Sequence, residues 1–125
     1  MSAETIADLN DRFRSTFIGG RVLMTRGIGA LPEGARAEIA EAVRAFAAFT
    51  PANDPHGEHD FAAFEAAGRR CMWKIDCYDA AMEYVSEDPS DPQRTTRVLT
   101  IMLADARPQN GRSIPVQWYT LASVD

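Results

Sequence analysis

The sequence predicts an α+β domain in which three helices pack on one face of a small antiparallel sheet. Three observations lead to this prediction. Apolar residues recur at helical spacing near the N-terminus, apolar and polar residues alternate in the middle of the chain, and proline and glycine signals separate these segments. The chain of 125 residues is short enough for one hydrophobic core, so residues 1–125 are expected to form a single domain.

Two helices are expected in the first half of the chain. The first runs from Glu4 to Phe17 and is predicted by apolar residues three and four positions apart, namely Ile6, Leu9, Phe13 and Phe17. The second begins at Pro32, a residue favoured at the first helical position, and extends to about Phe49. Its expected buried stripe consists of Ile39, Val43 and Phe46.

Short strands are expected to build the sheet. Three of them form an antiparallel meander, and a possible fourth precedes it. The expected ranges are 59–66, 70–78 and 81–86 for the meander and 21–25 for the fourth strand. Ala67-Gly68 supplies the first turn. Pro115 restricts the apolar residues 114–121 to an edge strand or a docked extension.

A third helix is expected after the meander. Asp91 suits the N-cap and Pro92 suits the first helical position, so a helix is predicted from Pro92 to about Ala106. With this arrangement the expected core includes Phe64, Trp73, Ile75, Leu99, Ile101 and Met102.

Two-residue turns would gather several reactive side chains on one face of the meander. Successive strand residues point to opposite faces, and the face that carries Trp73 is almost purely apolar, which marks it as the core side. The opposite face is then expected to carry His59, Lys74, Asp76, Tyr78 and Glu83. Lys74 is the only lysine of the chain.

This face has three interpretations. It is a solvated surface with cross-strand ion pairs, a surface that binds a ligand or partner, or a catalytic site. In the catalytic interpretation His59 is the general base, Asp76 orients its imidazole and Lys74 stands beside them. In the binding interpretation Tyr78 and Glu83 contact the partner, together with Trp118 and Tyr119 of the C-terminal segment.

The segment from Asp54 to Asp60 contains both histidines of the chain. His56, His59 and Asp54 are residue types that could bind a divalent metal such as Zn²⁺. Their spacing matches no known zinc motif, and the segment is predicted to be a loop. The alternative is a loop held by its own side-chain hydrogen bonds, without a cofactor.

Composition limits the function classes. The net charge is −5, which does not favour nucleic-acid binding, since that requires a basic patch. No apolar run is long enough to span a membrane, and the N-terminus does not read as a signal peptide. Cys71 and Cys77 are expected on one strand, ~20 Å apart, too far for a disulfide. A cytoplasmic location is therefore expected.

Ordered strings of residues resemble a bacterial family of unknown function, domain-of-unknown-function family 3768. The strings span residues 20–27, 53–61, 73–79 and 97–105. The resemblance implies a bacterial, cytoplasmic protein and supplies no activity. It also implies that residues 108–125 extend beyond the family-like core, and that an aromatic residue is usual where Cys77 stands.

The expected function is that of a non-enzymatic accessory factor that binds a protein partner. The sequence has no GxSxG, P-loop, CxxC or dinucleotide-binding motif, and Trp118-Tyr119 could contact a partner. The resemblance implies a role in defence, counter-defence or plasmid upkeep. The alternative is a small hydrolytic enzyme centred on His59, with or without a bound metal.

Overall fold

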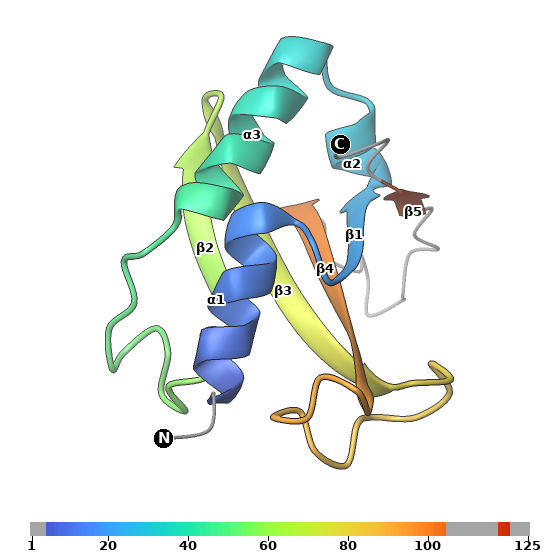
Figure 1. The fold of residues 1–125 in the computed structure, drawn as a ribbon. Coiled ribbons are helices and arrows are strands. Elements are labelled where there is room, and N and C mark those ends of the chain that lie inside the picture. Colours follow the sequence, from blue (N-terminus) through green and yellow to red (C-terminus); the bar gives the residue numbers. More distant parts are fainter. Residues whose placement is uncertain (1–4, 105–117, 121–125) are drawn as a thin grey trace, which may run out of the picture.

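The computed structural model describes residues 5–104 and the backbone of residues 118–120. Its elements follow one another as α1 (Ile6–Thr16), β1 (Gly20–Thr25), α2 (Arg26–Gly29), α3 (Glu33–Ala45), β2 (Phe61–Ala66), β3 (Arg69–Asp79), β4 (Thr95–Leu103) and β5 (Trp118–Thr120). The helices lie on one side of the sheet (Figure 1). The predicted α+β class, with three helices on one face of a small sheet, is confirmed.

The sheet is mixed rather than antiparallel. Its strand order is β2-β3-β4-β1-β5. β1 runs parallel to β4, whereas the β2–β3, β3–β4 and β1–β5 pairs are antiparallel. The predicted fourth strand near the N-terminus is present as β1, but it pairs with β4 instead of extending a meander. The only predicted meander pair that forms as expected is β2–β3.

The hairpin of β2 and β3 has the predicted register. Ala67 and Gly68 form its two-residue turn with positive φ angles of 54° and 70°, as a type I′ turn requires. Phe61 is paired with Lys74, and Ala62 with Trp73. Residues of the two strands therefore share faces as the sequence predicted.

The predicted helix from Pro92 to Ala106 is wrong, because residues 95–103 form the central strand β4. The side chain and carbonyl of Asp91 accept hydrogen bonds from the N–H groups of Gln93 and Arg94, so Asp91-Pro92 starts a turn and not a helix. Five consecutive residues of β4, 97–101, are buried. A central strand that is covered on both faces shows no alternation, which is why its apolar run resembled a helix.

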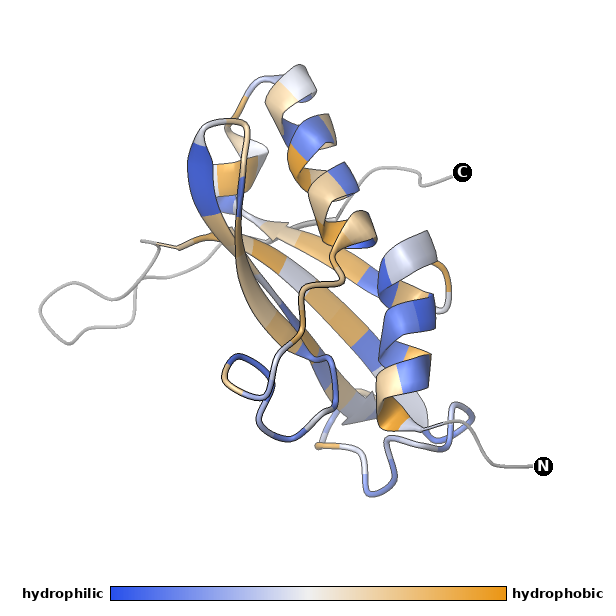
Figure 2. Ribbon diagram, turned by 90° about the vertical axis from the view of Figure 1, so that its left-hand side faces the viewer, coloured by the Kyte–Doolittle hydropathy of each residue, from blue (hydrophilic) through white to orange (hydrophobic). Residues whose placement is uncertain are grey.

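The predicted third meander strand is also wrong. Residues 81–86 form a turn and an irregular segment, with a single bridge between Val85 and Tyr78. The second helix begins as expected but ends at Ala45, and Phe46 has an extended backbone. The chain then continues as a loop to residue 60, and the hydrophilic parts of the loops lie at one end of the sheet (Figure 2).

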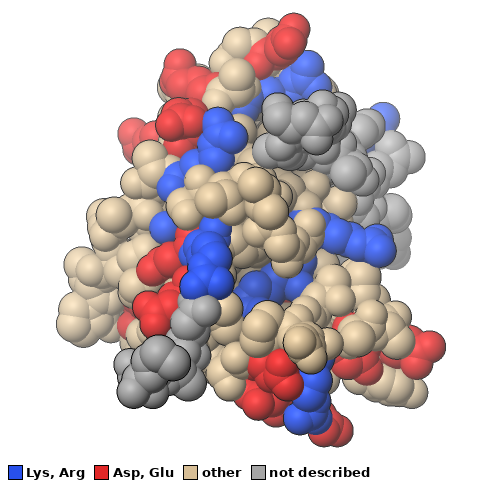
Figure 3. All heavy atoms as spheres, in the orientation of Figure 1, with Lys and Arg blue, Asp and Glu red and all other residues tan. Residues whose placement is uncertain are grey.

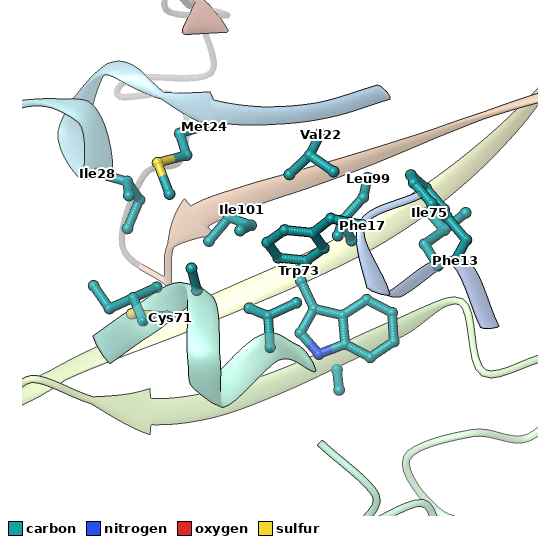
Figure 4. Close-up of a cluster of buried hydrophobic side chains, with 14 residues drawn as sticks. Phe13, Phe17, Val22, Met24, Ile28, Cys71, Trp73, Ile75, Leu99 and Ile101 are labelled. Carbon is teal, nitrogen blue, oxygen red and sulfur yellow. The ribbon is translucent and has the colours of Figure 1, made fainter. Parts of the chain in front are cut away.

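The hydrophobic core lies between the sheet and the helices. Trp73, Leu99 and Ile101 are fully buried there, and Ile75 is buried. Figure 4 shows Trp73 among core side chains from the strands and helices. Phe64 is only half-buried, and Met102 is half-buried on the opposite face, because it pairs with Met72. None of the helices in residues 5–104 is long and apolar enough to cross a membrane.

Replacement of Trp73 by alanine is expected to lower the free energy of unfolding by about 3–5 kcal/mol, since it removes a fully buried indole and leaves a cavity. Denaturant unfolding followed by circular dichroism measures this loss. Tyr84→Ala is the aromatic control, because Tyr84 is exposed, and it should change stability by less than about 0.5 kcal/mol. Equal effects of the two substitutions would contradict the placement of the core.

Candidate functional site

Polar side chains are concentrated at one end of the core, between α1 and the loop that precedes β2. We call this group the polar cluster. It consists of Asn10, Asp11, Arg14, Asp54, His59 and Arg97. Several of these residues are buried, so each needs hydrogen-bond partners to offset the loss of water.

His59 is held between two carboxylates. Its Nδ1 lies 2.8 Å from Oδ2 of Asp11 on α1, and its Nε2 lies 3.4 Å from Oδ2 of Asp54. The imidazole is stacked on the Phe49 ring with a centroid distance of 3.9 Å and an angle of 2° between the planes. Nδ1 is therefore hydrogen-bonded to α1, and Nε2 lies within ion-pair distance of Asp54.

The loop positions Asp54 through its own hydrogen bonds, as one of the two sequence interpretations predicted. Thr50 and Asn53 exchange side-chain-to-backbone hydrogen bonds, and the Asn53 amide donates to the Ala48 carbonyl. The buried carboxylate of Asp54 accepts from the backbone N–H of His59 at 3.2 Å. The loop is therefore folded around Asp54 before it reaches β2.

Arg14 connects α1 to the end of α3. Its guanidinium donates to the carbonyls of Val43 at 3.1 Å and Phe46 at 2.7 Å, and to Asp11 at 2.9 Å. The last carbonyls of a helix lack partners within the helix and carry partial negative charge, so a buried cation is well placed there. The guanidinium carbon also lies 5.0 Å from the centre of the Trp73 ring.

Arg97 extends the cluster to the centre of the sheet. Its Nε donates to Oδ1 of Asn10 at 2.7 Å, and its guanidinium also donates to the Pro89 carbonyl. The amide of Asn10 in turn donates to the Glu58 carbonyl at 2.9 Å. Burial lowers the pKa of Arg97 from its ordinary value, because the charged form has lost water. Asn10 thus joins α1, β4 and the loop before β2.

Cys77 lies opposite Arg97 in the β3–β4 register. Burial raises the pKa of its thiol, and this effect outweighs the nearby Arg97 charge. A thiol with a raised pKa is a poor nucleophile at neutral pH. Cys71 and Cys77 both lie on β3 and are not joined by a disulfide, in agreement with the prediction that they do not pair.

Lys74 and Asp76 lie on the other face of the sheet. Their side chains form an ion pair of 3.1 Å and remain 42% and 39% exposed. We call this face of β2 and β3 the open face, because none of the described helices packs on it. Its side chains include Phe61, Met72, Lys74, Asp76 and Tyr78.

The prediction that His59 shares the face of Lys74 and Asp76 is wrong. His59 has a φ of 53°, so the extended backbone begins only after it. Its ring stacks on Phe49, which contacts the Trp73 ring edge-on at 6.1 Å. The imidazole therefore lies on the side of the helices, and the predicted catalytic arrangement of His59, Asp76 and Lys74 does not form.

The remaining predicted binding residues are placed as follows. Tyr78 lies on the open face, and Val85 bridges to it. Glu83 lies in the turn after β3, where its N–H donates to Oδ1 of Asp79. The backbone of Trp118 and Tyr119 belongs to β5, which pairs with β1, and their side chains lie outside the described residues.

An open depression of about 430 Å³ lies beside His59. Its lining residues are Phe49, Thr50, Pro51, Asp54, Pro55, His56, Gly57 and His59. Of the predicted metal ligands, His59 and Asp54 lie next to each other, with 3.4 Å between Nε2 and Oδ2, and His56 lines the depression. In residues 5–104, no group of three or more His, Cys, Asp or Glu side chains is arranged to hold a metal ion.

Asp11, Arg14 and Asn10 were not predicted as site residues. The sequence could have indicated that Asn10 is buried, because its spacing to Phe13 and Phe17 places it on the apolar stripe of α1. Asp11 and Arg14 are polar residues of an amphipathic helix, and such residues are usually solvated. Apart from the contact between Asp11 and Arg14 themselves, their partners are 29 to 48 positions away in the sequence, so these contacts become visible only in the fold.

A family model for proteins of unknown function matches residues 24–106. The chain belongs to this family, DUF3768. The resemblance seen in the sequence is therefore confirmed. The match contains β2, β3, β4 and the loop with Asp54 and His59, whereas α1 with Asn10, Asp11 and Arg14 precedes it. No curated protein and no solved structure matches the chain.

Asn10→Ala is expected to lower the free energy of unfolding by about 2–4 kcal/mol, because it leaves the buried Arg97 Nε and the Glu58 carbonyl without their partner. Denaturant unfolding is the measurement. Ser15→Ala, on the exposed side of the same helix, is the control and should cost less than about 0.5 kcal/mol. A comparable, small loss for both would mean that Asn10 does not organise the cluster.

Proposed function

We propose that this member of DUF3768 is a non-enzymatic binding protein that contacts a protein partner through its open face. The observation that carries this proposal is the combination of exposed apolar side chains and a charge pair on that face. Phe61 is 44% exposed and Val85 is 75% exposed, and they flank the Lys74–Asp76 pair. Interfaces commonly combine such apolar and aromatic groups with polar residues at the rim.

The chemistry of the face specifies the kind of partner. Phe61, Met72 and Tyr78 offer an apolar and aromatic centre, and Tyr side chains often contribute strongly to binding. Lys74 and Asp76 present opposite charges next to each other. We infer a partner with an apolar patch and a matching pair of opposite charges.

The opposite side of the molecule, where the helices lie, has acidic and basic side chains intermixed over its surface (Figure 3).

The geometry of His59 supports a structural role. A general base needs a ring nitrogen that is free to take a proton from substrate or water. Nδ1 of His59 is hydrogen-bonded to Asp11, and Nε2 lies only 3.4 Å from the buried carboxylate of Asp54, whereas Lys74 and Asp76 lie on the other face. The cluster joins α1, α3 and the loop before β2, which is what a structural role requires.

The biological setting is part of the proposal. A bacterial, cytoplasmic accessory factor in defence, counter-defence or plasmid upkeep is supported by the sequence resemblance alone. A direct contact with nucleic acid is not proposed, because the net charge is −5 and binding of phosphates depends on clustered cations.

The binding proposal predicts that partner capture depends on the open face. Tagged wild-type chain should recover a specific protein from host cells, and a chain with Lys74→Glu and Tyr78→Ala should recover at least about tenfold less, a loss of about 1.4 kcal/mol. Arg44→Glu is the matched control, since it also removes the cation of an exposed ion pair, here with Glu41 on α3. Quantitative mass spectrometry measures the recovered protein. Equal recovery with all three chains would refute the assignment of this face.

A hydrolytic function is the second candidate, and one observation favours it. Asp11 contacts Nδ1 of His59 beside an open depression, and an acid–imidazole pair of this kind is common in hydrolases. We expect no turnover of ester or amide substrates above background, because Asp54 faces the other ring nitrogen. Turnover that disappears with His59→Ala but persists with His56→Ala, a lining residue of the same depression, would establish the hydrolase instead.

A further inference from the structure

The outer edge of β2 is open in the part of the chain that the structure describes. β2 is the first strand of the sheet order and pairs only with β3. The backbone N–H of Ile75 donates to the Asp60 carbonyl at 2.7 Å. In an antiparallel pair the bonded residues alternate, so the even-numbered residues of β2 bond to β3. The N–H and C=O groups of Phe61, Ala63 and Glu65 therefore point away from the sheet.

This edge lacks the usual devices that prevent strand addition. Natural edge strands carry lysine, proline, a bulge or inward charges. β2 has the sequence Phe-Ala-Ala-Phe-Glu-Ala, in which Glu65 is the only charge. Its register with β3 is unbroken over all six residues. An open strand of this composition is suited to pair with another strand.

We propose that a second copy of this chain pairs with β2 and forms an antiparallel, two-fold symmetric dimer. A two-fold axis at Ala63 places Phe61 opposite Glu65 of the second copy and Ala63 opposite its own equivalent. The outward N–H and C=O groups of Phe61, Ala63 and Glu65 then bond to those of Glu65, Ala63 and Phe61 of the second copy. Each of these three pairs exchanges two bonds, which gives about six hydrogen bonds. Both copies keep their helices on the same side of the joined sheet.

The charges at the two ends of β2 are complementary under this symmetry. Asp60 precedes the strand and Arg69 follows the turn, and Arg69 is exposed. In the dimer, Asp60 lies opposite Ala66 of the second copy, one strand spacing of ~4.8 Å away. Arg69 of that copy lies on the next strand, a further ~4.8 Å from Ala66, within reach of the long arginine side chain. Asp60 and this Arg69 project from the same face, because Ala66 and Arg69 are paired. The symmetry repeats the contact at the other end of the seam.

The side chains along the seam also favour a second copy. Ala62 faces Phe64 of the other chain in a non-bonded pair, where side chains approach most closely. Phe64 is only half-buried in the single chain and packs at the margin of the core, so it gains cover. At the axis itself the opposed side chains are two alanines, which do not clash.

Dimerisation would join two five-stranded sheets and place the two open faces side by side. The proposal does not rest on the proposed function. The seam is formed by the edge of β2 and shares Phe61 with the open face, but Lys74 and Tyr78 lie outside it. The proposal is tested with the purified chain alone, so its failure and the failure of partner capture are distinguishable.

The test is sedimentation velocity of the full chain over a wide concentration range. The wild type should show a monomer–dimer equilibrium. Ala63→Pro removes an outward N–H that β3 does not use, so the monomer should still fold, which circular dichroism verifies. Because the change occurs in both copies, it should raise the dimer Kd at least about tenfold. Ala63→Ser keeps the N–H and is the matched control.

Charge exchange tests the register. Asp60→Arg and Arg69→Asp should each weaken the dimer, because like charges then face each other across the seam. An equimolar mixture of the two variants should form a heterodimer with opposite charges at both ends. A chain that stays monomeric at every concentration would overturn the proposal, as would a dimer that Ala63→Pro leaves unchanged. If the mixture of the two variants does not dimerise, the proposed register is wrong. If β2 pairs with strands of other proteins but not with a second copy of this chain, the second copy is not the occupant.

Discussion

The buried guanidinium of Arg14 is the contact on which the arrangement of the helices depends. It reaches from α1 to the carbonyls of Val43 and Phe46, where α3 ends, and lies over the Trp73 ring of the sheet. A hydrophobic interface alone would allow α1 and α3 to slide against the sheet, because burial is not directional. The fixed geometry of a guanidinium with several donors defines their positions. Asp11 balances its charge and at the same time holds His59.

The polar cluster therefore has the composition of a catalytic site, but its contacts hold α1, α3, β4 and the loop before β2 together. Histidine, aspartate and arginine occur together, yet their hydrogen bonds are made to other groups of the protein. Asn10 illustrates the point, because one side chain contacts both a buried arginine of β4 and a carbonyl of the loop. Buried polar networks of this kind define one arrangement of the elements more sharply than apolar packing does. The open face has the opposite character, since its charged pair is half-exposed and its aromatic groups are unburied.

The sequence allowed α1, β1, the start of α3 and the β2–β3 hairpin to be predicted, because each has a local signal. The alternation around Trp73 and the Ala67-Gly68 turn gave the correct register. β4 was missed because Asp91-Pro92 imitates a helix start and because a strand covered on both faces does not alternate. His59 was placed on the wrong face because one residue with a positive φ changes the direction of the chain. The contacts of Asp11 and Arg14 join distant segments, and nothing local indicates them.

The place of β4 in the sheet has a consequence for the synthesis of the protein. Gly20 of β1 is paired with Arg97 of β4, 77 positions later in the chain. The nascent chain can form α1 and the β2–β3 hairpin early, but β1 has no neighbour on its inner side until β4 has left the ribosome. Folding with such distant pairings is slow, because closing a long loop costs entropy before the contacts form. In the interval β1 and β3 both present apolar surface, and the newly made chain is most exposed to aggregation and to chaperones at that stage.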